Sequence, residues 1–191
     1  MMAASMPDNV NEASARVAAA NHALLLRAVS GVLRNAQDGD LPLFAWTLGM
    51  SQPALLGMIG QCFPELGELE AMPDPQYHRL AEAVPADFPA LVAMLLEHQT
   101  DSAKEQHTDW LARAIAVACH GGRHLWEDMG LGCRDDVSRL LNTYFQPLYR
   151  RNSRHLRWKR FLFAELGASR GMSDYQPPSC GKCAQYPICF P

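Results

Sequence analysis

Apolar residues recur at intervals of three and four along most of the chain, and the alternation typical of β-strands is rare. This spacing gathers apolar side chains on one face of an α-helix. Successive patterns of this kind, joined by short loops, predict an all-α fold built as an irregular helical bundle. The predicted helices cover Glu12–Leu33, a segment after Ser51, a segment after Asp87, Ser102–His120, residues 137–145 and residues 156–166, with a short turn at His124–Met129.

Residues that start and stop helices sharpen these bounds. Ser51, Asp87 and Asn152 are expected N-caps, because their side chains can accept hydrogen bonds from the first backbone N–H groups of a helix. Pro147 is expected to end the helix across residues 137–145. Residues 63–75 contain three prolines and predict a loop.

The character of the chain changes at both ends. Residues 1–10 are polar and are expected to form a disordered N-terminal tail. Residues 11–171 carry the helical apolar pattern and form the predicted helical domain. Residues 172–191 contain four prolines and three cysteines but little that could form a core. They predict a non-helical, cysteine-rich metal-binding tail.

Composition places the chain in a broad class. Of the 191 residues 48% are apolar, which is enough for a buried core without disulfides. No apolar run approaches the ~18–20 residues of a membrane span. The N-terminus lacks the pattern of a signal peptide, so we expect a cytoplasmic protein with reduced cysteines. Cys62 and Cys119 fall within apolar helical patterns and are expected to be ordinary buried residues.

The tail supplies the clearest chemistry, because three cysteines follow one another as Cys180-x-x-Cys183-x5-Cys189. The two-residue gap lets the first two thiolates reach one metal centre, and the third can close the loop around it. Structural zinc takes four ligands, so a fourth would come from elsewhere in the chain. A three-iron cluster needs three thiolates, and a four-iron cluster held by three leaves one iron open. Three cysteines therefore favour a reactive iron–sulfur cluster. The residues considered as a fourth ligand are Cys133, His120, His124 and His155.

Charge is distributed unevenly. The segment from Val137 to Ala164 has no acidic residue, while the rest of the chain has ten basic and twenty acidic residues. This segment is either a solvated helix face or an anion site beside the tail, for an acidic protein, a metal oxyanion or nucleic acid. We do not expect nucleic acid, because the net charge of the whole chain is −3. The basic residues of the segment are Arg139, Arg150, Arg151, Arg154, Arg157, Lys159 and Arg160.

Three separated segments together resemble the NifQ family of nitrogen-fixation proteins. The similarity runs from about Leu41 to the C-terminus. The segments are His124-Leu125-Trp126-Glu127-Asp128-Met129-Gly130-Leu131, then Asn152 followed by Trp158-Lys159-Arg160-Phe161, and Pro178-Ser179-Cys180-x-x-Cys183-x-x-Tyr186-x-x-Cys189-Phe190.

This resemblance implies a cytoplasmic accessory factor that carries an iron–sulfur cluster, takes up molybdenum and supplies it for the iron–molybdenum cofactor of nitrogenase. The implied partners are nitrogenase cofactor-assembly proteins and molybdate or a molybdenum–sulfur species. The family's cluster motif of four cysteines places ligands on Cys180, Cys183 and Cys189. Its first cysteine corresponds to Tyr175, and a further family-like cysteine corresponds to Gly167.

Two hypotheses of different class follow. In the first, a molybdenum oxyanion approaches through Arg154, Arg157 or Lys159 and joins a cluster that Tyr175, Cys133 or a histidine can complete. In the second, the chain is a zinc-stabilised helical adaptor whose basic helix binds an acidic partner or nucleic acid. Neither needs catalytic turnover. The chain also lacks Gly-x-Ser-x-Gly, His-Glu-x-x-His and phosphate-binding glycine motifs, so we expect no enzyme. His124 is expected to be structural.

Overall fold

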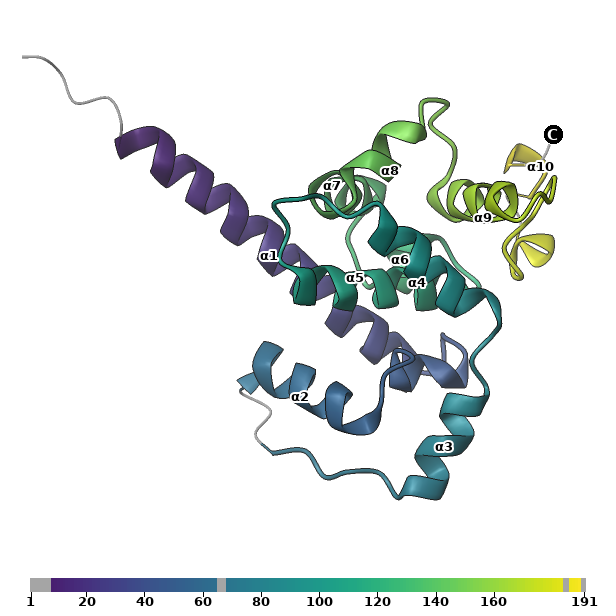
Figure 1. The fold of residues 1–191 in the computed structure, drawn as a ribbon. Helices are drawn as coiled ribbons and strands as arrows, with labels where there is room; N and C mark the ends of the chain where they lie inside the picture. The colour runs from purple at the N-terminus through teal and green to yellow at the C-terminus, as the bar shows by residue number, and fades with distance from the viewer. Residues whose placement is uncertain (1–7, 65–67, 184–185, 190–191) are drawn as a thin grey trace, which may run out of the picture.

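The computed structural model describes residues 8–64, 68–183 and 186–189, and every regular element within these ranges is a helix. The predicted all-α fold is confirmed (Figure 1). The elements are α1 (Asp8–Gln37), η1 (Leu43–Thr47), α2 (Gln52–Cys62), α3 (Asp74–Glu82), α4 (Asp87–Glu97), α5 (Glu105–Ala118), α6 (Leu125–Asp128), α7 (Arg134–Tyr144), α8 (Gln146–Arg151), α9 (Trp158–Ser169), η3 (Cys180–Lys182) and α10 (Tyr186–Cys189).

Helix α1 is the longest element, and only its second half packs against the body of the protein (Figure 1). Leu25, Val29 and Val32 are fully buried where this half contacts α5, η1 and α7. The apolar spacing that includes Val17 continues into the first half, but Val17 is 57% exposed. Helical spacing shows which face is apolar and does not show where neighbouring helices stop covering it.

The core joins α4, α5, α7 and α9 to the second half of α1. Helices α4 and α5 pack closely along each other, and α4 also contacts α9. The predicted apolar residues of α5 and α7 are buried, as are Trp158 and Phe161 of α9. One continuous apolar core therefore holds α9 against the bundle, and the cysteine tail follows directly from its end (Figure 1).

Several predicted helix boundaries are wrong. Pro147 lies in the first turn of α8, where its missing N–H costs no hydrogen bond, and so it begins a helix that the sequence did not predict. Asn152 does not cap α9; the N-cap is Arg157. Asp87 is the first residue of α4 rather than its N-cap. Ser51 stands at the N-cap of α2 but makes no capping hydrogen bond through its side chain.

The expectation of a non-helical tail is only partly correct, because residues 172–179 form no helix but two short helical turns follow them. Residues Cys180–Lys182 form a 3-10 turn, and Tyr186–Cys189 form a short helix with Pro187 in its first turn. Prolines in this segment begin helical turns instead of preventing them. The predicted disordered segment 1–10 falls largely on residues 1–7, outside the described residues; α1 begins at Asp8. None of the described helices is both long and apolar enough to cross a membrane.

Candidate functional site

The three tail cysteines line one pocket. Cys180, Cys183 and Cys189 are each partly buried and face a cavity of about 90 Å³ formed between α6, α9 and the tail. A single water molecule needs only ~10–15 Å³, so this cavity has room for a larger group. The turn η3 places Cys180 and Cys183 at the pocket, and the short helix α10 brings Cys189 back to it.

The pocket is strongly basic. Among the described residues that line it, five carry positive charge and none is acidic. Such surroundings attract anions. Of the seven basic residues predicted for this region, three line the pocket, whereas Arg139, Arg150, Arg151 and Arg154 do not. The five lining residues are Arg123, Arg134, Arg157, Lys159 and Arg160.

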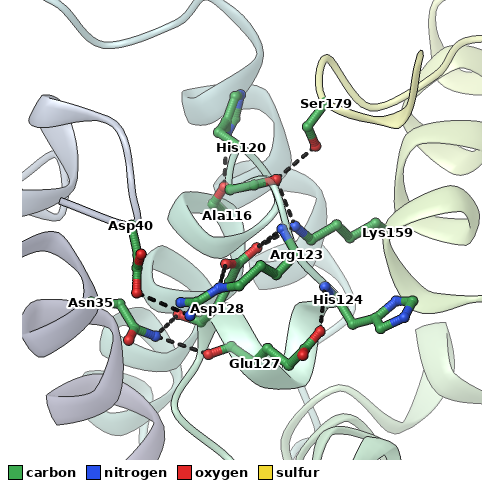
Figure 2. A network of polar contacts seen from close by, with 11 residues as sticks. Asn35, Asp40, Ala116, His120, Arg123, His124, Glu127, Asp128, Lys159 and Ser179 are labelled. Atoms are coloured by element: carbon green, nitrogen blue, oxygen red, sulfur yellow. Dashed lines mark hydrogen bonds and ion pairs between the residues drawn. The ribbon is translucent and has the colours of Figure 1, made fainter. Parts of the chain in front are cut away.

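Lys159, one of the lining residues, forms a buried ion pair with Asp128. Figure 2 shows this pair and the polar contacts around it. Asp128, the last residue of α6, is 0% exposed. Its carboxylate accepts hydrogen bonds from Lys159 Nζ at 2.6 Å and from Arg123 Nε at 3.1 Å. Arg123 also pairs with Asp40 at 2.9 Å. Because a buried carboxylate is costly unless it is paired, the contacts with Lys159 and Arg123 compensate its burial and tie α9 to α6.

The tail is fastened to this same ion pair through one backbone carbonyl. The oxygen of Gly121 accepts a hydrogen bond from Lys159 Nζ at 2.9 Å and another from Ser179 Oγ at 2.6 Å (Figure 2). Ser179 immediately precedes Cys180. A side chain at Gly121 would meet Asp128 Oδ2 at 2.2 Å, so the glycine is needed for this close approach. The position of the first cysteine therefore depends on the Lys159–Asp128 pair.

The thiols near the ion pair have raised pKa values. Burial raises the pKa of Cys180, and the neighbouring Cys183 and Cys189 raise it further, while Lys159 opposes this effect. Burial raises the pKa of Cys119 to about 12. Cys119 is fully buried in the core, as predicted, whereas Cys62 is only partly buried. A metal that bound Cys180 as a thiolate would displace the proton of the thiol, so its affinity would weaken as pH falls.

Of the four residues considered as a fourth ligand, one lines the pocket and three lie elsewhere. His124 lines the pocket beside the three cysteines. Cys133 is exposed at the N-cap of α7 and is not among the lining residues. His155 lines a different hollow. His120 is buried outside the pocket; its Nδ1 lies 2.8 Å from the carbonyl oxygen of Ala116, and burial lowers its pKa.

Tyr175 also lies outside the pocket lining. Its ring stacks on Phe163 with centroids 5.8 Å apart. The pKa of Asp87 is lowered overall. Burial raises this pKa, but hydrogen bonds with the Tyr175 hydroxyl and the Arg170 guanidinium lower it more strongly. Asp87 also accepts a hydrogen bond from Arg170 at 2.7 Å. Tyr175 thus anchors the start of the tail to α4 and α9.

The glycine at position 167 makes this anchor sterically possible. A Cβ at Gly167 would lie 2.4 Å from Cβ of Tyr175. We therefore expect Gly167→Ala to destabilise the protein and to speed proteolysis of the tail, although alanine is the better helix former. The matched control is Gly57→Ala in α2, where nothing lies within 4 Å of the new Cβ. It should stabilise by about 0.5–1 kcal/mol in urea unfolding. Equal effects of the two changes would contradict this account.

Metal binding by the tail stays a prediction. Among the residues that the structure describes, no three His, Cys, Asp or Glu side chains are arranged to hold a metal ion. Sequence reasoning also missed the functions of Asp128, Arg123 and Ser179, which join the tail to the core. The available signal for Asp128 was an acidic residue in a short turn with Leu125, Trp126 and Met129, although Glu127 beside it carries the same charge.

Comparison with known proteins identifies the same family that the sequence motifs resemble. The model of the NifQ family matches residues 28–191. The chain is 32% identical over 179 residues to Protein NifQ of Azotobacter vinelandii, covering 90% of this chain and 88% of that protein. It is 32% identical over 160 residues to Protein NifQ of Rhodobacter capsulatus, covering 83% of each. No solved structure matches the chain. This chain therefore belongs to the NifQ family, which is involved in nitrogen fixation.

Proposed function

We propose that this chain is a cytoplasmic, non-enzymatic accessory protein that supplies molybdenum for the iron–molybdenum cofactor of nitrogenase. Cys180, Cys183 and Cys189 hold an iron–sulfur cluster, either three-iron or four-iron with one open iron. The observation that supports this most directly is that all three cysteines line the same pocket as five basic side chains. The cargo would pass to nitrogenase cofactor-assembly proteins.

The chemistry of the pocket fits an anionic metal–sulfur ligand. Soft thiolates bind iron–sulfur clusters, and several of them gathered at one site accumulate negative charge. Guanidinium groups offset that charge and bind oxyanions through paired hydrogen bonds. Molybdate is such an oxyanion. The pocket therefore combines a holder for the cluster with a receptor for the cargo.

Only some of the basic residues expected to receive the oxyanion are suitably placed. Of these three residues Arg157 lines the pocket, and so does Arg160, which the sequence did not single out for this role. Arg154 is exposed and is not among the lining residues. Lys159 also lines the pocket, but its ammonium group is bound to Asp128 and to the carbonyl of Gly121. Arg157 and Arg160 are assigned to the cargo because they lie on the pocket lining with the three cysteines, and Lys159 is assigned to positioning the tail.

His124 is the best-placed residue to complete the site. Its backbone N–H donates to Glu127 Oε2 at 2.9 Å, which fixes the start of α6 at the pocket. The imidazole is a common metal ligand and suits iron as well as zinc. The sequence alone favoured a structural histidine. We assign it the open position of the cluster because it lies beside the thiols.

Anaerobic reconstitution with iron and sulfide, followed by incubation with molybdate, tests the proposal. The expected result is visible cluster absorption, an electron paramagnetic resonance signal that changes on addition of molybdate, and molybdenum that stays with the protein through gel filtration. One zinc per chain with no bound iron would instead support the adaptor hypothesis. Iron without retained molybdenum would overturn the trafficking function while leaving the cluster in place.

A further inference from the structure

The loop between α8 and α9, residues 152–157, is held in one conformation by side chains behind it. Asn152 is 6% exposed, and its side chain donates to the carbonyl of Leu156 at 2.9 Å and accepts from its N–H at 2.8 Å. Arg134 of α7 donates through Nη2 to the carbonyls of His155 and Leu156, both at 3.1 Å. Four hydrogen bonds thus fix a short exposed loop.

This loop carries backbone strain at its tip. His155 has a φ of +52°, in the left-handed region that side chains other than glycine rarely adopt. Such a conformation persists only where the surroundings impose it, typically at functional sites. The hydrogen bonds from Asn152 and Arg134 impose it here. The loop is therefore preorganised, and a partner would pay little conformational entropy to bind it.

The outer surface of the loop is cationic. Arg150 and Arg154 are exposed, and neither has an ion pair within the described parts of the chain. A hollow of about 390 Å³ lies beside the loop, between α7 and α8. Arg134 and Trp158 line both this hollow and the pocket of the cysteines. The cationic surface is therefore continuous with the rim of the proposed cluster site.

We propose that Arg150, Arg154 and His155 form a docking surface for the acidic face of a protein that receives the cargo. This inference rests on the proposed function and adds where the acceptor binds. A carboxylate-bearing surface seated there would lie next to the cysteine pocket, so the cargo would pass without release into water. Opposite charges would also speed the encounter and make it sensitive to salt.

Two other anionic ligands fit the surface less well. A small oxyanion bound inside the hollow would contact Asp135, which lines it, whereas a protein surface bound to the exposed Arg150 and Arg154 need not enter the hollow. A nucleic acid would extend beyond the loop, because phosphates continue along its whole length. It would then meet the rest of a chain whose residues outside 137–164 include ten basic and twenty acidic ones. A limited acidic patch on a folded partner matches the limited size of the cationic surface.

The test measures binding of a fluorescein-labelled poly-glutamate peptide to the full chain by fluorescence anisotropy at low and moderate salt. The double variant R150E/R154E should bind roughly tenfold or more weakly, which corresponds to about 1.4 kcal/mol or more. The control R27E/R34E changes the net charge equally at exposed residues of α1 and should bind like the wild type. Equal loss in both variants would overturn the proposal.

Further arms identify the ligand and separate this proposal from the cluster itself. The proposal of a protein partner would be overturned if duplex DNA bound more tightly than the peptide. It would also be overturned if molybdate, but not sulfate at equal ionic strength, displaced the peptide. R150E/R154E should retain iron after reconstitution. A variant with alanine at Cys180, Cys183 and Cys189 should lose iron but bind the peptide normally, so either proposal can fail alone.

Discussion

Asp128→Ala is expected to destabilise the protein by about 3–5 kcal/mol, the usual cost of removing one partner from a buried ion pair. Lys159 is only 7% exposed and would remain charged in the core without its carboxylate. Arg123 would suffer less, because it is 40% exposed and keeps Asp40 as a partner. Urea unfolding followed by circular dichroism would measure the change.

The matched control removes both charges. Asp128→Leu combined with Lys159→Met replaces the pair with apolar side chains, and such exchanges are often neutral in stability. We therefore expect the double variant to be much more stable than Asp128→Ala. A double variant that is less stable than either single change would mean that the pair contributes something other than mutual charge compensation.

The double variant also separates stability from tail position. Without Lys159, the carbonyl oxygen of Gly121 keeps, among the described residues, only the hydrogen bond from Ser179. The fold should then survive while the tail becomes more accessible to protease and less able to retain iron. Ser179→Ala should show a milder form of the same defect, since it removes a single hydrogen bond to Gly121 worth about 0.5–1.5 kcal/mol.

Local sequence patterns predicted α1, α2, α4, α5, α7 and α9, because burial repeats along each of them, but they did not predict α3 or α8. Phe88 and Leu91 of α4, and Trp110 and Ile115 of α5, are all buried as expected. Helix ends were predicted less well because they depend on tertiary contacts. Asn152 has the chemistry of an N-cap, yet the fold uses it to fix a loop.

The candidate site shows the same limit. Cysteine spacing identified Cys180, Cys183 and Cys189 as a group, and the structure places all three at one pocket. Spacing could not show that Lys159 would turn inward to Asp128, thirty-one residues earlier in the chain. Partners so far apart in sequence are chosen by packing, and no local pattern contains that information.

Cys180→Ala is expected to lower the iron retained after reconstitution by at least about tenfold, because even the outer partners of metal ligands are typically worth roughly 10–100-fold in affinity. Cys180 is partly buried at the pocket. Its loss should leave helical content and urea stability near the wild type, since the pocket lies at the edge of the core. Iron content and cluster absorption, measured without oxygen, provide the readout.

Three further variants make this result specific to the pocket. Cys133→Ala removes an exposed thiol that does not line the pocket and should retain iron fully. Tyr175→Phe should also retain iron, because the tyrosine anchors the tail from outside the pocket. His124→Ala should retain iron but change the electron paramagnetic resonance signal, since it removes the nitrogen assigned to the open position. If Cys133→Ala or Tyr175→Phe lost iron as fully as Cys180→Ala, the ligands would not be those of this pocket.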